Sequence, residues 1–253
     1  MTALIETSAI TMRFGGIQAL NNCCLTVEGG TIAGLVGPNG SGKTTLFNCI
    51  SGFLRPDSGT IVFDGRNITG SGARRVFRLG LARTFQRPRV FDRLTVLENA
   101  LVGARRDEGW MRALVTPPGS RREQMRASAV LEFVGLSELR GSLAGELSFG
   151  QRKLLELAYL LVGEPRVILL DEPAGGINPS LRNRLADRIR ELNGQGVTFL
   201  IVEHDMQFVS DLCDVVTVLD QGRAIAAGTP AAIQQNPAVL EAYLGGSETA
   251  SAR

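Results

Sequence analysis

A glycine-rich segment that directly follows an apolar run most constrains what this 253-residue chain can fold into. The apolar run, residues 31–36, predicts a buried strand, and a helical pattern begins at Thr45. Between the two lie Gly37, Pro38, Asn39, Gly40, Ser41, Gly42, Lys43 and Thr44. This string fits G-x-x-x-x-G-K-[ST], and a strand before it and a helix after it are the context that the motif requires. The sequence therefore predicts an α/β fold built on a phosphate-binding loop.

The phosphate loop, as we call residues 37–44, has the chemistry to hold a nucleotide polyphosphate. Its glycines let the backbone fold around the phosphates, so that N–H groups and the positive end of the following helix point at them. We expect Lys43 to supply a point charge for the β- and γ-phosphates, and Thr44 to offer its hydroxyl oxygen to Mg²⁺. Thr45 is expected close to the α-phosphate. A glycine turn that only caps a helix is the alternative, and it leaves Lys43 unexplained.

Two adjacent carboxylates follow a second apolar run. Residues 167–170 are all apolar and lead into Asp171 and Glu172, so both acids are expected at the carboxyl end of a buried parallel strand, where ligands bind. We predict that Asp171 holds Mg²⁺, often through water, and that Glu172 accepts a proton from an attacking water or orients it. In the alternative interpretation the two acids cap the turn at Pro173.

Composition excludes several classes of protein. With 44% hydrophobic and 21% charged residues, the chain is predicted to be a folded, soluble protein rather than a disordered or collagen-like one. No apolar run reaches the roughly 18 residues that span a bilayer, and the first residues lack the pattern of a secretory signal. A net charge of +2 is too small to argue for nucleic acid as a partner.

Cysteine and arginine are two residue types that could form additional sites. The four cysteines have no metal-ligand spacing, so we expect no zinc site and cysteines that are reduced, buried or without a special role. Arginines are concentrated between Gly72 and Leu94, where Asp92 is the only acid, and this basic face is most simply a solvated surface. Its members are Arg74, Arg75, Arg78, Arg83, Arg87, Arg89 and Arg93.

The order of patterns along the chain predicts the architecture. The N-terminal part is rich in strands, with alternation in residues 10–14 and 24–27. The middle is helical: residues 95–98 form a capping box, residues 121–134 form a second helix, and a short amphipathic helix is expected within 104–124. From Pro165 onward strands and helices alternate, which predicts a parallel sheet. Near the end, the turn at residues 220–222 predicts a hairpin before a last helix.

One pentapeptide discriminates among the proteins that share a phosphate loop. Residues 147–151, Leu-Ser-Phe-Gly-Gln, precede an apolar helix and resemble the LSGGQ signature of ATP-binding cassette (ABC) ATPases. On their own, Ser148 and Gln151 form a capping box, and the two interpretations are compatible. In the family this segment completes the nucleotide site of the opposing protomer, which implies that Ser148, Gly150 and Gln151 contact the nucleotide of a second subunit.

Other landmarks of the family occur in the same order in this chain. Phe14 matches the aromatic residue that stacks on adenine, and Gln86 matches the glutamine that senses Mg²⁺ and the γ-phosphate. His204, the only histidine, follows an apolar run at the place where the family keeps a histidine for the γ-phosphate. One departure is Asn178, which stands where the family has an aspartate and which also suits a helix N-cap before Pro179.

The resemblance implies one nucleotide-binding domain over residues 5–244. In this division residues 5–87 and 161–244 form a P-loop core with an N-terminal antiparallel β subdomain, residues 88–160 form a helical subdomain with the signature, and residues 245–253 form a flexible tail. It further implies a dimer that binds ATP and Mg²⁺, formed with the same or a different ATPase subunit. Transmembrane permease subunits and, indirectly, a periplasmic or extracellular solute-binding protein are the implied partners, at the cytoplasmic face of the membrane.

Within the family, several segments resemble the ATPases of branched-chain amino acid importers. An importer of urea or amides and a lipopolysaccharide-type exporter remain alternatives, because nothing in such an ATPase touches the cargo. A non-transport ABC ATPase is disfavoured because the chain has one cassette, and a P-loop kinase or GTPase is disfavoured by the signature and His204. The segments that carry this resemblance are residues 14–20, 94–99, 110–123, 203–206 and 236–245.

Overall fold

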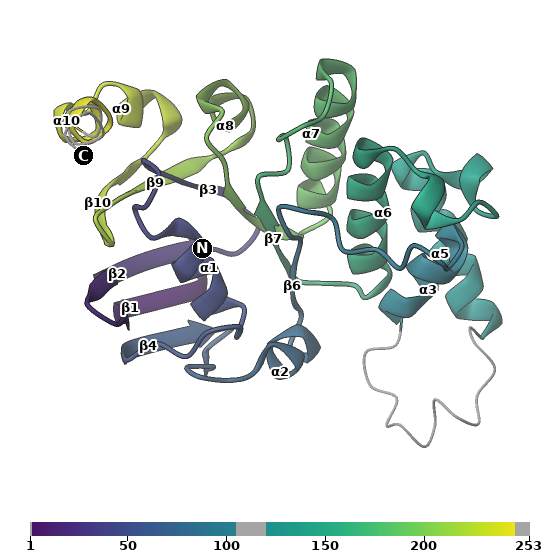
Figure 1. Cartoon of the computed structure of the whole chain (residues 1–253), viewed down its shortest axis with the longest axis horizontal. Coiled ribbons are helices and arrows are strands. Elements are labelled where there is room, and N and C mark those ends of the chain that lie inside the picture. Colours follow the sequence, from purple (N-terminus) through teal and green to yellow (C-terminus); the bar gives the residue numbers. More distant parts are fainter. Residues whose placement is uncertain (1, 105–119, 246–253) are drawn as a thin grey trace.

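A six-stranded sheet forms the centre of the computed structural model, which describes residues 2–104 and 120–245 (Figure 1). Neighbouring strands run parallel except for the β9–β10 hairpin, so the predicted parallel sheet and the predicted hairpin are both confirmed. In spatial order the strands are β10 (Arg223–Gly228), β9 (Val215–Asp220), β3 (Ile32–Val36), β8 (Thr198–Val202), β7 (Val167–Asp171) and β6 (Leu81–Arg83).

The central strands are buried on both faces, as their uninterrupted apolar sequences predict. Along β7, Val167 and Leu169 belong to one hydrophobic cluster, whereas Ile168 and Leu170 belong to the other. Successive side chains of a strand point to opposite faces, and this produces two cores on either side of one sheet.

The first core lies between the central sheet and a second, antiparallel sheet with the strand order β2-β1-β4-β5. Helix α1 (Lys43–Ile50) contributes Leu46, Phe47 and Ile50 to the same core. The first two strands are longer than the alternation predicts because they pair along their whole length as a hairpin with several register shifts. The antiparallel strands are β1 (Ala3–Phe14), β2 (Ile17–Glu28), β4 (Ser58–Phe63) and β5 (Arg66–Asn67).

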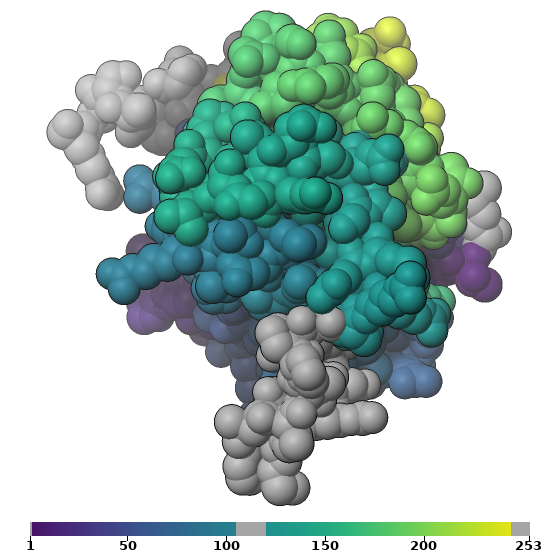
Figure 2. All heavy atoms as spheres, turned by 90° about the vertical axis from the view of Figure 1, so that its right-hand side faces the viewer, coloured from purple at the N-terminus to yellow at the C-terminus, as the bar shows by residue number. Residues whose placement is uncertain are grey.

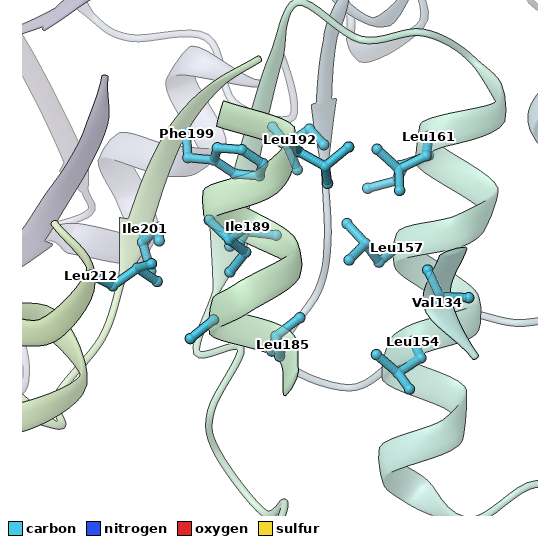
Figure 3. Packing of buried hydrophobic residues seen from close by; sticks show 14 of the residues in the cluster. Val134, Leu154, Leu157, Leu161, Leu185, Ile189, Leu192, Phe199, Ile201 and Leu212 are labelled. Atoms are coloured by element: carbon cyan, nitrogen blue, oxygen red, sulfur yellow. The ribbon is translucent and has the colours of Figure 1, made fainter. Parts of the chain in front are cut away.

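The second core lies on the other face of the sheet and is covered by helices. Figure 3 shows α7 (Pro179–Gly194) between the sheet and α6 (Phe149–Val162). Ile189 packs near Phe199 and Ile201 of the sheet, while Leu157 of α6 faces α7 from the opposite side. Helix α7 is thus apolar on two sides, and it attaches the helical part of the chain to the sheet.

The remaining helices complete the fold. Figure 2, viewed from the right-hand side of Figure 1, shows the teal segments of the helical part covering much of the near face, with green segments above them. The helical part contains α3 (Val96–Ala104), α5 (Arg121–Val134), two 3-10 turns (Ser137–Leu139 and Ala144–Glu146) and α6. The others are α2 (Ala73–Arg78), α8 (Met206–Leu212), α9 (Pro230–Gln234) and α10 (Pro237–Gly245).

The predicted helix starts are confirmed by their hydrogen bonds. Thr95 and Glu98 exchange both bonds of a capping box, and the Ser148 and Gln151 side chains do the same at the start of α6. Asn178 accepts the N–H of Leu181 with Pro179 at the first helical position. Helix α2 and strand β6 were not predicted, because both are too short to show a period.

Several other expectations concern single residues or segments. Three cysteines are buried as expected, but Cys24 is exposed because it lies on the outward side of β2. All four are free thiols.

In the described residues no helix is long and apolar enough to cross a membrane. The short helix expected within residues 104–124, and most of the tail expected from residue 245 onward, lie outside the described residues.

Helix α3 approaches α6 so closely that only glycine fits at position 103. A Cβ atom on Gly103 would lie 1.8 Å from the backbone oxygen of Tyr159. We expect Gly103→Ala to lower the free energy of unfolding by about 1–3 kcal/mol, as overpacked cores do. The matched control is Gly194→Ala at the exposed end of α7, where nothing lies within 4 Å and a gain of about 0.5 kcal/mol is expected. Urea denaturation measures both, and equal effects would contradict the close packing.

Candidate nucleotide site

The candidate site lies where four adjacent parallel strands end. In the order β3-β8-β7-β6, the carboxyl ends meet at one edge of the sheet, because parallel neighbours run in the same direction. The phosphate loop follows β3, His204 follows β8, Glu172 follows β7 and Gln86 follows β6. Sheet topology therefore brings together segments that are more than 100 residues apart in the sequence.

Two glycines of the phosphate loop are required by the space around them. Gly37 has a φ of +147°, and a Cβ there would lie 2.0 Å from the Leu219 backbone oxygen. Gly42 has a φ of +104°, and its Cβ would lie 2.6 Å from the Ala19 backbone oxygen. These contacts fix the loop against β9 and β2.

The rest of the phosphate loop presents backbone groups to solvent. Gly42 caps helix α1 without any side-chain hydrogen bond, so the first turn keeps N–H groups that can bind an anion. Ser41 is buried, Pro38 is half-buried, and Asn39 and Gly40 are exposed.

Lys43 bridges the loop from inside. Its Nζ donates to the backbone oxygens of Gly37 and Pro38, both at 2.8 Å. Burial lowers the pKa of the Lys43 ammonium, and the nearby carboxylate of Glu172 opposes this effect. The Thr44 side chain is exposed and that of Thr45 is half-buried. The lysine predicted for phosphate binding therefore lies close to the carboxylate predicted to activate water.

Asp171 and Glu172 lie at the end of β7, as predicted. Asp171 is 7% exposed, and its Oδ2 accepts a hydrogen bond from Arg83 at 2.8 Å. The Glu172 Oε2 accepts a hydrogen bond from Gln86 Nε2 at 2.9 Å. Glu172 has a φ of +48°, an uncommon conformation for a residue with a side chain, and its N–H donates to the Val202 oxygen. A backbone outlier of this kind often marks a functional position.

His204 is near the same carboxylate but points mainly into solvent. Its side chain is 68% exposed, and Nδ1 lies 4.0 Å from Glu172 Oε1 and 3.7 Å from Glu203 Oε2. Glu203 is buried and accepts N–H groups of Ala174, His204 and Asp205. Glu203 thereby holds the segment that carries His204 against the segment that follows Glu172.

Four other predicted residues lie on β1 and at the start of α6. Ser148 is exposed at the start of α6, and a Cβ on Gly150 would lie 2.3 Å from Leu181 Cδ2, so the helix start packs closely on α7. Gln151 is half-buried one turn later. Phe14 is 47% exposed at the end of β1. In the described part of the chain, no hydrogen bond joins these four to the phosphate loop.

Comparison with known proteins identifies the family. A model described as "ABC transporter" matches residues 20–175, more than half of the chain. The chain belongs to the ABC transporter ATP-binding family. A second model, "Branched-chain amino acid ATP-binding cassette transporter", matches residues 225–249.

Individual relatives align along nearly the whole of this ABC ATPase. The high-affinity branched-chain amino acid transport ATP-binding protein BraF of Pseudomonas aeruginosa is 41% identical over 249 residues, which cover 96% of this chain and 98% of BraF. LivG of Escherichia coli K12, a protein of the same description, has the same identity and coverage. The crystal structure of the ADP conformation of MJ1267, an ATP-binding cassette of an ABC transporter, has a TM-score of 0.86 and 35% identity, over 97% of this chain and 100% of that one.

Two charged residues of α6 contact this site although the sequence analysis did not select them. Lys153 Nζ donates to the backbone oxygens of Glu172 at 2.6 Å and Gly175 at 2.7 Å. Glu156 accepts the N–H groups of Arg89 at 3.0 Å and Phe85 at 3.4 Å, on either side of Gln86. Burial lowers the pKa of Lys153 and raises the pKa of Glu156 to about 7. Glu156 has one sequence signal, a charge inside the otherwise apolar run 154–162, whereas Lys153 lies just before that run and follows Arg152.

The oxygen donors at the strand ends fit Mg²⁺. They are the hydroxyl of Thr44, the carboxylate of Asp171 and the amide of Gln86. Residues 2–104 and 120–245 contain no group of three or more His, Cys, Asp and Glu side chains that could hold a metal. Mg²⁺ is usually bound by one or two carboxylates together with substrate phosphates, rather than by a cage of protein ligands. The donor set therefore suits Mg²⁺ that arrives with a nucleotide.

We expect Lys43→Ala to weaken ATP binding about 10- to 100-fold, because a hydrogen bond to a charged group contributes about 1.5–3 kcal/mol. Titration with a fluorescent ATP analogue measures the change. Arg66→Ala on the exposed strand β5 removes the same charge and serves as the control. Equal affinities for Lys43→Ala and the control would show that the ammonium does not contact phosphate.

Proposed function

We propose that this ABC ATPase powers the uptake of branched-chain amino acids through separate membrane subunits. The observation that carries the proposal is the match of residues 225–249 to the branched-chain amino acid model, outside the segment shared by ABC transporters in general. The names of the relatives BraF and LivG support the same substrate class. The described residues do not assign the cargo, so the substrate must be established by a transport measurement.

The phosphate loop is the part that binds ATP. Its backbone N–H groups and Lys43 hold the phosphates, Thr45 lies beside the α-phosphate, and the exposed ring of Phe14 stacks on adenine. Thr44 and Asp171, with Gln86, hold Mg²⁺ together with the phosphates. When bound, Mg²⁺ neutralises phosphate charge that develops during the reaction.

Glu172 is the base in hydrolysis. It accepts a proton from the attacking water, and the hydrogen bond from Gln86 fixes one of its oxygens in place. His204 approaches the other oxygen to 4.0 Å, so it lies where it can contact the γ-phosphate or the water. Catalysis of this kind depends mainly on positioning and electrostatic stabilisation. The Glu172 backbone is positioned by the hydrogen bond from its N–H to the Val202 oxygen at the end of β8.

The signature residues serve a second ATPase subunit. Ser148, Gly150 and Gln151 begin a long helix at the surface, and a helix N-terminus with accessible N–H groups favours a phosphate. In the described residues they make no hydrogen bond to the phosphate loop of the same chain, which is consistent with a nucleotide held by a partner, either a second copy or a related ATPase. Asn178 lacks the charge of the family aspartate and contributes through its N-cap.

The partners follow from the proposed transport role. Transmembrane permease subunits supply the channel, and a solute-binding protein outside the membrane acts indirectly through them. The ATPase then works as a peripheral subunit at the cytoplasmic face of the cell membrane. A net charge of +2 gives no support to a role with nucleic acid.

We expect Glu172→Gln to bind ATP with near wild-type affinity and to hydrolyse it about 10²- to 10⁴-fold more slowly, the usual contribution of a general base. A phosphate-release assay measures hydrolysis, and a nucleotide titration on the same sample measures binding. Glu191→Gln makes the same change on the exposed face of α7 and should leave both unchanged. Near-normal turnover of Glu172→Gln would remove this residue as the base.

The substrate is tested by uptake of labelled leucine in source cells that lack the protein and carry wild type, Lys43→Ala or the control Arg66→Ala. We expect wild type and Arg66→Ala to restore uptake, and Lys43→Ala to fail. Labelled urea is measured alongside. Leucine uptake that never depends on the protein would overturn the branched-chain assignment and direct attention to urea, amides or an exported lipopolysaccharide, while the ATPase assignment would stand.

A further inference from the structure

A buried arginine lies directly behind the candidate metal-binding carboxylate. Arg83 is the last residue of β6, three residues before Gln86, and its side chain is 5% exposed. Its Nη2 donates to Asp171 Oδ2 at 2.8 Å. In the described residues, Asp171 Oδ1 accepts no hydrogen bond. Arg83 thus binds one oxygen of the carboxylate and leaves the other oxygen available to a ligand.

The same guanidinium also contacts the helix that follows the phosphate loop. Its Nη1 donates to Asn48 Oδ1 at 2.6 Å and to Ser51 Oγ at 3.0 Å. Asn48 and Ser51 lie one turn apart at the end of α1, and Thr44 lies near the start of that helix. One side chain therefore joins β7, which carries Asp171, to α1, which carries Thr44, and both residues are proposed Mg²⁺ ligands.

Three aromatic rings surround the guanidinium. The Arg83 Cζ lies 5.4 Å from the ring centroids of Phe47 and Phe85, and 5.8 Å from that of Phe53. These distances suit cation–π contacts, which are strongest where water is excluded. Rings on several sides and acceptors at both terminal nitrogens leave the guanidinium little freedom to turn.

We propose that Arg83 is a positioning residue for Mg²⁺. It holds the Asp171 carboxylate by Oδ2 and presents Oδ1 toward the metal. It also keeps the end of β7 in a fixed position relative to α1, which carries Thr44. The inference rests on the proposed use of MgATP. An outer partner of a metal-binding carboxylate orients it and tunes its affinity, and loss of such a partner costs about 10- to 100-fold in metal affinity.

The shape of arginine is needed for this task. Its planar group donates from separate nitrogens to acceptors on opposite sides, and its flat faces stack on rings. A lysine at position 83 would keep the charge but would present one ammonium on a flexible stem, which cannot hold Asn48, Ser51 and Asp171 in the same geometry. The Arg83→Lys variant therefore separates the effect of the positive charge, which it keeps, from the effect of the donor geometry, which it loses.

The test measures binding of the non-hydrolysable analogue AMP-PNP by calorimetry, with Mg²⁺ and with EDTA, so that it does not depend on activity. The quantity compared is the ratio of the two affinities. For Arg83→Lys we expect binding in EDTA to stay near wild type and the Mg²⁺-dependent gain to fall about 10-fold or more. Electron paramagnetic resonance of Mn²⁺ bound with AMP-PNP should show a weaker or altered metal environment in the variant.

Two further variants keep the result interpretable. Asn48→Ala removes one anchor of the guanidinium and leaves the Arg83–Asp171 pair, so a smaller loss of the Mg²⁺-dependent gain is expected; it carries the test if Arg83→Lys does not fold. Arg166→Lys is the matched control, because Arg166 pairs with Asp64 at the opposite end of β7 and is exposed. It should leave both affinities unchanged.

Two outcomes would overturn the inference alone. If Arg83→Lys and Asn48→Ala keep the full Mg²⁺-dependent gain, Arg83 does not position the metal ligand. If binding in Mg²⁺ and in EDTA falls equally, Arg83 is only structural. A wild-type protein that shows no Mg²⁺-dependent gain would instead overturn the proposed use of MgATP, and this inference with it.

Discussion

Parallel pairing of β3, β8, β7 and β6 is the interaction on which the site depends. Each of these strands ends at the same edge of the sheet, and each is followed by residues for which we propose contacts with phosphate, water or metal. The apolar residues on both faces of the strands hold this edge in place through two separate cores. A shift of one residue would exchange the side chains that fill the two cores, so the close packing of both cores fixes the register and hence the relative heights of the functional side chains.

Three charged side chains that are removed from water near this edge have specific partners in the described part of the chain. Glu203 accepts three N–H groups, Glu156 accepts two, and Lys153 donates to backbone oxygens. Desolvation of a charge is costly unless hydrogen bonds replace the lost water, so each of these groups holds its loop in a narrow range of positions. Buried charges therefore help to order the loops that carry Gln86, Glu172 and His204, together with apolar contacts such as those of Ala174 and Met206 with the core.

The sequence predicts the parts of the structure that depend on local patterns. The phosphate loop, the buried strand before Asp171 and the caps at Ser148 and Asn178 are each encoded within a few residues, and the structure has them in place. Contacts across the chain were not predictable in this way. The local run of arginines predicts a solvated basic face that includes Arg83, yet Arg83 is buried. A local pattern could not show this, because its partners Asn48 and Asp171 lie 35 and 88 residues away. Lys153 and Glu156 were missed for the same reason.

Helix α6 links the surface to the buried site. Its first residue after the cap is exposed, while Lys153 and Glu156, one turn apart, reach the segments around Glu172 and Gln86. A helix transmits displacement along its axis because its backbone hydrogen bonds resist stretching, and packing on α7 through Gly150 and Leu157 limits its rotation. A ligand that contacts the start of α6 therefore acts on a helix that is already hydrogen-bonded to the segments around Glu172 and Gln86, the proposed base and metal ligand. The signature residues can influence these segments through α6 without approaching the phosphate loop of their own chain.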